Sequence, residues 1–233
     1  CRGCRSHFEA GEGGIIMMDT LMEIRERIEN CTDCVLHHSR VKAVPGEGPE
    51  NAEIMFIGEG PGFHENQQGK PFVGQAGKFL DELLEKAGLN RNDVFITNVV
   101  KCRPPGNRDP QPEELEACAK YLDRQIELIN PKIIVTLGRF SMAKFFGAVK
   151  ISQIHGRSRK IGDRLVVAMY HPAAALHQPA LKNTLLDDFS KLRIYLQNAS
   201  KNLVANENQL KKPLLEEIEE EIEEDKPTQL SLF

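Results

Sequence analysis

The sequence predicts an α/β domain whose largely parallel sheet is covered by helices on both faces. Short apolar segments rich in β-branched residues alternate along the chain with longer segments of helical periodicity. Loops rich in Gly or Pro follow several of these apolar segments. Ligands of parallel sheets bind where such loops leave the carboxyl ends of the strands. We therefore expect a functional site along that edge of the sheet.

The expected elements follow one another in simple alternation. Segments of strand length, closed by Gly or turn residues, predict strands at 53–58, 93–100, 132–138 and 164–170. Helical periodicity predicts helices at 75–87, 112–129, 139–147 and 184–197. The apolar face of the first helix is expected to consist of Phe79, Leu80, Leu83, Leu84 and Ala87.

One domain is expected to account for most of the chain. For 233 residues of which 40% are hydrophobic, we expect a single domain over residues 17–200. The polar segment 1–16 is expected to be a disordered or non-native extension. Its Cys1 and Cys4 form a C-x2-C pair, so a second metal site is the alternative. Residues 201–233 are expected to form an acidic flexible tail.

Charge and hydropathy restrict the class of protein. The net charge is −4, but residues 201–233 hold 4 Lys/Arg against 9 Asp/Glu, which leaves the rest of the chain near neutral. Nucleic-acid binding would therefore need a local basic patch. No apolar run approaches the ~20 residues of a membrane span, and the first residues lack the apolar region of a signal peptide. We expect a cytoplasmic monomer without membrane contact, whose cysteines do not form disulfides.

Four cysteines have a spacing typical of a metal site. Cys31 and Cys34 form a C-x2-C pair, and Cys102 and Cys118 follow at longer spacing. Four thiolates can bind Zn²⁺ or an iron–sulfur cluster. Because structural zinc sites usually use two tight C-x2-C pairs, the spread second pair favours the larger cluster. Zinc and free thiols are the alternatives.

The loop after the first strand contains a candidate catalytic carboxylate. In GEGPG (58–62), Glu59 stands at the end of the strand, and Gly58 and Gly60 let the backbone approach a ligand. A tight turn with a solvated Glu explains this motif equally well.

Three further candidates stand near the ends of other predicted elements. Phe72, in GKPFVGQAG (69–77), is either a core residue or a stacking platform. Asn98 stands near the end of a strand and could pair with the donor and acceptor edge of a ligand. His171 opens HPAAAL (171–176) directly after the last strand. Together with Glu59 they outline a pocket with a carboxylate, a ring, an amide and a histidine.

These motifs together resemble the family 4 uracil-DNA glycosylases, the iron–sulfur enzymes of the uracil-DNA glycosylase superfamily. The resemblance covers about residues 20–197 and includes GEGPG, GKPFVGQAG, NVVKCRPP, the four cysteines in order and HPAAAL. It implies a three-layer α/β/α sandwich with a four-stranded, largely parallel central sheet. It also implies a [4Fe-4S] cluster on the four cysteines, and base excision repair in which uracil is flipped out of DNA and its N-glycosidic bond is hydrolysed, leaving an abasic site.

The resemblance also implies a role for each pocket residue. Asn98 would read uracil by accepting from N3–H and donating to O4, while Phe72 would stack on the flipped ring. Glu65 matches a position suspected of excluding the methyl group of thymine. Glu59 would activate water or stabilise the cationic sugar. His171 would donate a hydrogen bond to uracil O2 as the base leaves.

Contacts to the rest of the DNA are expected beside the pocket. Leu176 would wedge into the base stack where the uracil left it. Basic side chains near the predicted site are candidate phosphate contacts: Lys101, Arg103, Arg108, His177 and Lys182.

Some residues depart from the family pattern. Residues 175–177 read Ala-Leu-His where many relatives have Leu-Leu-Arg, so His177 is expected to be a weaker, pH-dependent phosphate contact. GEGPG in place of GEQPG, and no basic insertion with a His after GKPFVG, argue against the branch that crosslinks itself to uracil-DNA. The alternatives are a non-catalytic superfamily member that binds nucleic acid in a replication complex, and a zinc-stabilised binding module.

The chain ends in the apolar pentapeptide QLSLF, after a run of Glu residues. This peptide resembles the motif by which bacterial proteins bind the replicative sliding clamp. The resemblance implies that four side chains enter pockets of that partner: Gln229, Leu230, Leu232 and Phe233. The alternative is a disordered tail that matches by chance.

Overall fold

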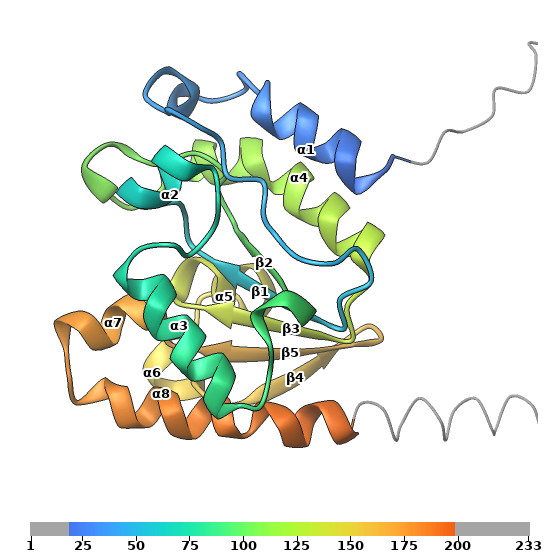
Figure 1. Ribbon diagram of the computed structural model, residues 1–233, viewed down its shortest axis with the longest axis vertical. Coiled ribbons are helices and arrows are strands. Elements are labelled where there is room, and N and C mark those ends of the chain that lie inside the picture. Colours follow the sequence, from blue (N-terminus) through green and yellow to red (C-terminus); the bar gives the residue numbers. More distant parts are fainter. Residues whose placement is uncertain (1–18, 199–233) are drawn as a thin grey trace, which may run out of the picture.

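A five-stranded sheet forms the centre of the protein (Figure 1). The computed structural model describes residues 19–198. The strand order is β2-β1-β3-β5-β4. The strands are β1 (Ile54–Gly58), β2 (Phe95–Asn98), β3 (Ile133–Leu137), β4 (Ser158–Ile161) and β5 (Arg164–Met169). The pairs β1–β2, β1–β3 and β3–β5 are parallel, so the carboxyl ends of four strands meet at one edge.

The expectation of an α/β sandwich is confirmed, but the count of four strands is wrong. The extra strand, β4, pairs antiparallel with β5 at the edge of the sheet. Its sequence, Ser-Arg-Lys-Ile, is largely exposed and carries none of the apolar pattern that identifies a buried strand. Charged residues on a short edge strand also discourage pairing with another chain.

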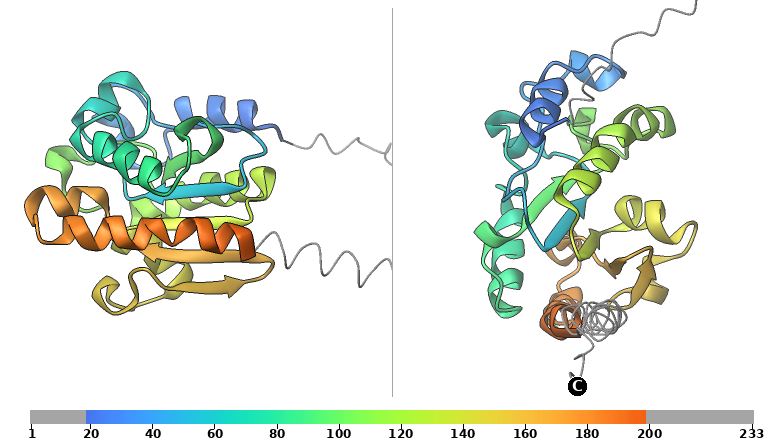
Figure 2. Two further views of the ribbon diagram at one scale, coloured as in Figure 1. Left: turned by 60° about the horizontal axis from the view of Figure 1, so that its bottom comes forward. Right: turned by 90° about the vertical axis from the view of Figure 1, so that its right-hand side faces the viewer.

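Helices cover both faces of the sheet (Figure 2). On one face, α3 (Gln75–Lys86) and α8 (Leu181–Ser190) pack against side chains such as Phe56 and Val135. On the other, α4 (Pro112–Ile129) and α5 (Arg139–Phe146) pack against Met55, Ile57, Ile134 and Val166. Neighbouring residues of β1 thus enter opposite cores, which is the period of a strand buried on both faces.

An outer layer lies on α4. The helix α1 (Leu21–Glu29) packs its buried Ile24 and Ile28 with Tyr121 of α4 and with the four cysteines. Its first turn is fixed by a capping box between Thr20 and Glu23.

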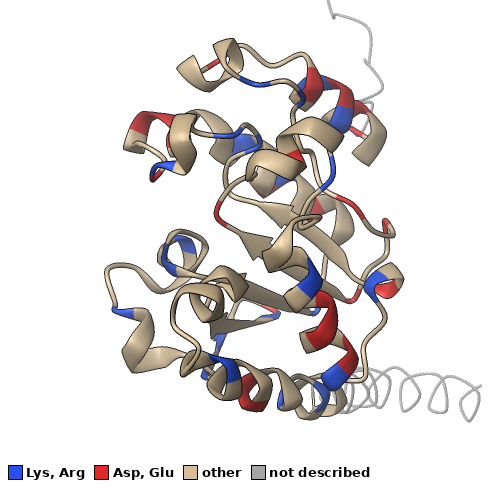
Figure 3. Ribbon diagram, turned by 60° about the vertical axis from the view of Figure 1, so that its left-hand side comes forward, with Lys and Arg blue, Asp and Glu red and all other residues tan. Residues whose placement is uncertain are grey.

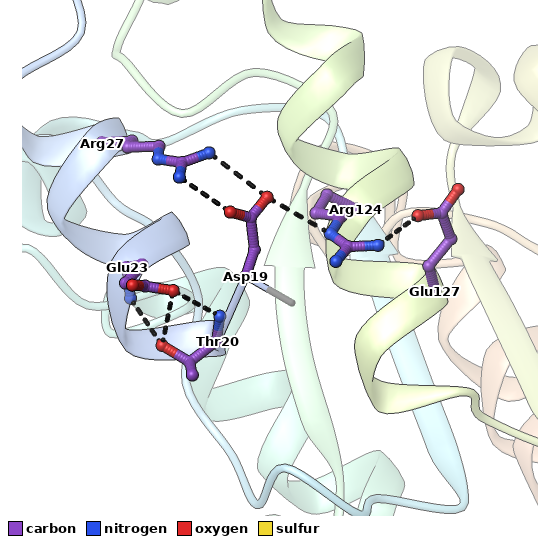
Figure 4. A network of polar contacts seen from close by, with 6 residues as sticks. All are labelled: Asp19, Thr20, Glu23, Arg27, Arg124 and Glu127. Carbon is purple, nitrogen blue, oxygen red and sulfur yellow. Dashed lines mark hydrogen bonds and ion pairs between the residues drawn. The ribbon is translucent and has the colours of Figure 1, made fainter. Parts of the chain in front are cut away.

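Ion pairs also join α1 to α4. Figure 4 shows the Asp19 carboxylate between Arg27 of α1 and Arg124 of α4. These contacts hold the segment that carries Cys31 and Cys34 against the domain.

Several short helices complete the domain. They are α2 (Phe63–Gln68), α6 (Ile151–Ile154) and α7 (Pro172–His177), with 3₁₀ turns at Val35–His38, Arg91–Asp93 and Pro105–Asn107. The periodicity of the sequence does not reveal them because each contains at most six residues. Within residues 19–198, no helix is both long enough and apolar enough to cross a membrane.

Candidate active site

A pocket of about 500 Å³ opens at the carboxyl ends of the parallel strands. In Figure 1 this edge of the sheet lies between α2 and α7. The pocket is lined by the residues that the sequence nominated for binding and chemistry: Glu59, Gly60, Glu65, Phe72, Asn98, His171 and His177. Residues from four separate segments of the chain therefore meet where the topology of a parallel sheet places a site.

Asn98 supplies an unsatisfied hydrogen-bonding group to this pocket. It ends β2, pairs in register with Gly58 of β1, and is only 2% exposed. Its Oδ1 is buried and has no hydrogen-bond partner within the described part of the chain. Because a buried acceptor without a partner costs about 1–3 kcal/mol, the side chain is poised to accept from a ligand donor.

Phe72 forms the apolar wall of the pocket. Its side chain is 6% exposed, and its φ of 52° lies in the left-handed region that costs a non-glycine residue free energy. A Cβ at Gly58 would come closer than 3.0 Å to both the Phe72 ring and Asn98 Oδ1. Gly58 is therefore required so that the ring and the amide can approach the end of β1 together.

The carboxylate of Glu65 holds the turn that carries Phe72. Its Oε1 accepts hydrogen bonds from the backbone N–H groups of Val73 and Gly74, each at 2.9 Å. A carboxylate bound by two backbone donors has little freedom to swing aside. Glu65 thus forms a rigid part of the pocket wall and fixes the strained turn at Phe72.

His171 stands opposite as a neutral ring. Its centroid lies 5.4 Å from that of Phe72, with the rings nearly parallel. Burial lowers the pKa of His171 to about 4. Its Nδ1 accepts a hydrogen bond from the Ala173 N–H at 3.1 Å, as the N-cap of α7. In a neutral ring the proton must then be on Nε2, which is left as a donor.

Glu59 lies just beyond the end of β1 and is partly buried. Burial, followed by the nearby charge of Asp109, raises the pKa of the Glu59 carboxyl, while Arg139 opposes the shift. A carboxylate with a raised pKa accepts a proton more readily than a solvated one. The alternative of a freely solvated turn residue does not match this burial.

The predicted DNA contacts occupy different positions. His177 lines the pocket and is exposed. Leu176, on α7, is 49% exposed. Lys182 is exposed, but its amine lies 3.6 Å from the Glu82 carboxylate and above the Phe79 ring. Figure 3, with the α2 and α7 side turned forward, shows Lys and Arg in several loops interspersed with Asp and Glu.

The prediction that Lys101 contacts a DNA phosphate is wrong, because the side chain is buried. Its side chain is 1% exposed, and its Nζ donates to Thr97 Oγ1, to the Asn98 carbonyl and to Gln125 Oε1 at 2.6–2.9 Å. Burial lowers its pKa to about 8. The side chain therefore holds the end of β2 from inside the protein. The apolar neighbours of Lys101 in NVVKC could have indicated from the sequence that its side chain is buried.

The two arginines that follow have protein partners. Arg108 lines the pocket and forms a two-pronged pair with the carboxylate of Glu114, at 2.6 and 2.9 Å. The Arg103 guanidinium lies 5.3 Å from the centre of the Phe63 ring. Phe63, exposed at the pocket rim, was not identified from the sequence, although an aromatic residue in a Gly-rich, polar loop was a usable signal.

The four cysteines Cys31, Cys34, Cys102 and Cys118 line one small pocket between α1 and α4. Among residues 19–198, no three His, Cys, Asp or Glu side chains are arranged to hold a metal ion. Nitrogen donors already approach two of the sulfurs. The Lys101 N–H points at Cys118 Sγ at 3.3 Å, and Arg40 points at Cys102 Sγ at 3.4 Å.

These cysteines fit a larger group better than a single ion. Four sulfurs that surround a common apolar pocket, without converging on one point, suit a cluster of several irons. N–H donors to sulfur are the contacts that stabilise bound thiolates. Burial raises the pKa of Cys118 to about 11, so a thiolate there needs such compensation.

Comparison with known proteins points to a single superfamily. The model of the uracil DNA glycosylase superfamily matches residues 45–197. The chain is 50% identical over 186 residues to the type-4 uracil-DNA glycosylase of Sulfurisphaera tokodaii, covering 76% of this chain and 84% of the relative. It is 47% identical over 184 residues to that of Archaeoglobus fulgidus (75% and 92%) and 49% identical over 189 residues to that of Saccharolobus solfataricus (76% and 86%).

The partly buried, neutral His171 predicts a pH-dependent stability. Its pKa is lowered from 6.5 to about 4 in the folded state, so the unfolded chain binds more protons between these values. The free energy of unfolding should therefore fall as the pH decreases from about 6.5 to 4, by up to about 3 kcal/mol from this residue. Urea unfolding should show this loss in the native protein and a smaller one in His171→Asn, which keeps an N-cap acceptor. Equal losses in both proteins would contradict the assignment.

Proposed function

The chain belongs to the uracil DNA glycosylase superfamily, and we propose that its pocket binds a uracil flipped out of DNA and that the residues described above excise it. The protein is a uracil-DNA glycosylase, a hydrolase of DNA repair, as its type-4 relatives support. The proposal concerns how this chain recognises the base and which side chains perform the reaction.

The buried, unpartnered oxygen of Asn98 carries the proposal. Uracil offers an N3–H donor next to an O4 acceptor, which matches the Oδ1 acceptor and the Nδ2 donor of one amide. Cytosine offers an acceptor at N3 and a donor at N4, so it would leave both amide groups facing like partners. Each unpaired group costs about 1–3 kcal/mol. The fixed amide would therefore select uracil over cytosine.

Phe72 and Glu65 would add to the selection of uracil, through stacking and through exclusion of thymine. The Phe72 ring, held in the pocket wall by its turn, would stack on the uracil. Glu65 is bound to the backbone of that turn and cannot move away easily. A rigid carboxylate beside C5 would leave no room for the methyl group of thymine.

His171 and Glu59 would perform the chemistry. As the bond between C1′ of the sugar and N1 of uracil breaks, its electron pair passes to the base, and the His171 Nε2–H donates to the developing negative charge on O2. A water molecule adds to C1′ and loses its proton to Glu59. The raised pKa of Glu59 favours this role as proton acceptor. Glu59 then releases this proton to solvent and the uracil anion takes one up, so the products are free uracil and an abasic site.

The rim would contact the rest of the DNA. Leu176, exposed on α7, would fill the space in the base stack that the uracil left. His177 would contact a phosphate beside the pocket mouth. Lys182 would do so only after leaving its exposed contact with Glu82, which costs little.

A [4Fe-4S] cluster on the four cysteines is the second part of the proposal. The four thiols line one pocket, and backbone and Arg40 donors already point at two of them. When bound, the cluster would supply structural crosslinking between α1, the loop after β2 and α4. Lys101 would connect this site to the uracil-binding Asn98, because its backbone N–H contacts Cys118 and its amine contacts the Asn98 carbonyl.

Binding to a replicative sliding clamp is the third part. The peptide of Gln229, Leu230, Leu232 and Phe233 lies outside the described residues, as do Cys1 and Cys4. The motif QLSLF supports the proposal by its match to bacterial clamp-binding peptides. The acidic run before it would keep this segment away from DNA.

Uracil recognition predicts the effect of Asn98→Asp. An aspartate has no N–H₂ donor, and its charge would repel the uracil O4. We expect excision from a uracil-containing oligonucleotide, measured as strand cleavage after alkali, to fall by roughly a hundredfold or more. Asn92→Asp, at an exposed position outside the pocket, should cleave at the native rate. Native activity of Asn98→Asp would remove the amide from its proposed role.

Iron and sulfide binding can be measured directly. We expect the protein purified without oxygen to be brown, to absorb near 400 nm, and to contain about four irons per chain. Cys118→Ser should lose the absorbance, whereas Cys4→Ser should keep it. A colourless protein that contains one zinc per chain would replace the cluster with the zinc alternative.

Clamp binding should separate from catalysis. Deletion of residues 229–233 is expected to abolish retention of the chain by an immobilised bacterial sliding clamp. Excision from short oligonucleotides should remain at the native rate, because the pocket lies within residues 59–177. If both binding and excision are lost, these residues belong to the fold and not to a partner site.

A further inference from the structure

Phe63 is an exposed aromatic side chain at the rim of the active-site pocket. It is the first residue of α2, lines the pocket, and is 53% exposed. Leaving such a ring in water forfeits much of the stabilisation that its burial would give. The side chain contributes little to the core, so its position suggests contact with a ligand that passes over the rim.

A cation holds one side of this ring. The Arg103 guanidinium lies 5.3 Å from the ring centre, and its Nε donates to Asn107 Oδ1 at 2.7 Å. The terminal nitrogens of Arg103 form no hydrogen bond with another group among residues 19–198. His64 meets the ring edge-on at 5.5 Å between centres. The ring is thus supported by neighbours while more than half of the side chain stays open, and free guanidinium donors lie next to it.

We propose that Phe63 and Arg103 form a binding subsite for the nucleotide next to the flipped uridine in an unpaired strand. The base stacks on the open surface of Phe63, and the free donors of Arg103 contact the adjacent phosphate. Stacking on an aromatic side chain accepts any base, since every base has a π-face. The inference rests on the proposed function, because it places a neighbour beside the uracil in the pocket.

The subsite should favour single-stranded DNA. In a duplex, the neighbouring base already stacks on the next pair and is hydrogen-bonded to its complement, so little is gained by contact with Phe63. In a single strand the base is free to leave its neighbours. Base–aromatic stacking is worth about 1–3 kcal/mol, which corresponds to a change of roughly 5- to 150-fold in kcat/KM.

Phe63→Ala tests the subsite. We expect kcat/KM on a single-stranded uracil oligonucleotide to fall roughly tenfold, with a much smaller change on the same sequence as a duplex. Phe63→Trp, which keeps a stacking surface, should retain the single-strand activity. Met22→Ala, at an exposed apolar position outside the pocket, should change neither activity.

A fluorescent neighbour reports the contact itself. In a single strand with 2-aminopurine next to a 2′-fluoro-deoxyuridine that resists cleavage, binding of the native protein should quench the fluorescence. Phe63→Ala should bind with less quenching. An unchanged single-strand activity, or equal losses on both substrates with unchanged quenching, would overturn the subsite. If the native protein does not release uracil at all, the proposed function fails and the subsite with it, whereas uracil release with no effect of Phe63→Ala overturns the subsite alone.

Discussion

The buried amine of Lys101 is the contact on which the arrangement of the site depends. It lies in the loop that follows β2, and it donates to Thr97, to the carbonyl of Asn98 and to Gln125 of α4. Removing an amine from water is costly unless each proton finds an acceptor. Here three acceptors surround it, so the end of β2 and the middle of α4 are held in one geometry. The Asn98 side chain therefore points into the pocket from a backbone that cannot easily shift.

This constraint also joins the two functional regions of the molecule. The backbone N–H of Lys101 contacts Cys118, while its side chain contacts Asn98. Cys102 is the next residue along the chain, and α1 covers the cysteines from outside. A single residue, Lys101, thus connects the packing of the cysteine pocket to Asn98. Short covalent and hydrogen-bonded connections of this kind explain how a structural cluster could influence recognition without touching the substrate.

Much of the fold follows from local patterns, but the site depends on long-range packing. The apolar, β-branched segments of β1, β2, β3 and β5 predicted their strands, because nearly all of their residues are buried in the sheet. The exposed strand β4 could not be identified, since its pairing with β5 stabilises a sequence with little strand preference of its own. The full set of hydrogen bonds of Lys101 was equally hidden, because one of its three acceptors, Gln125, belongs to α4 and is distant in sequence. The candidate residues Glu59, Phe72, Asn98 and His171 were named correctly as neighbours, whereas the hydrogen bonds of Glu65 to the Phe72 turn required coordinates.

The electrostatics of the pocket disfavour the charged forms of Glu59 and His171 before a substrate binds. Burial raises the pKa of Glu59 and lowers that of His171, because removal from water disfavours the charged form of each group. Cleavage of a glycosidic bond creates a positive sugar and a negative base at the same moment. A carboxylate near the sugar and an N–H donor near the base, both partly buried, would meet these two charges in a setting where such interactions are stronger than in bulk water. Because His171 is neutral before the bond breaks, its N–H would form an ordinary hydrogen bond with O2 of the uncharged base, and this bond would strengthen as the negative charge develops.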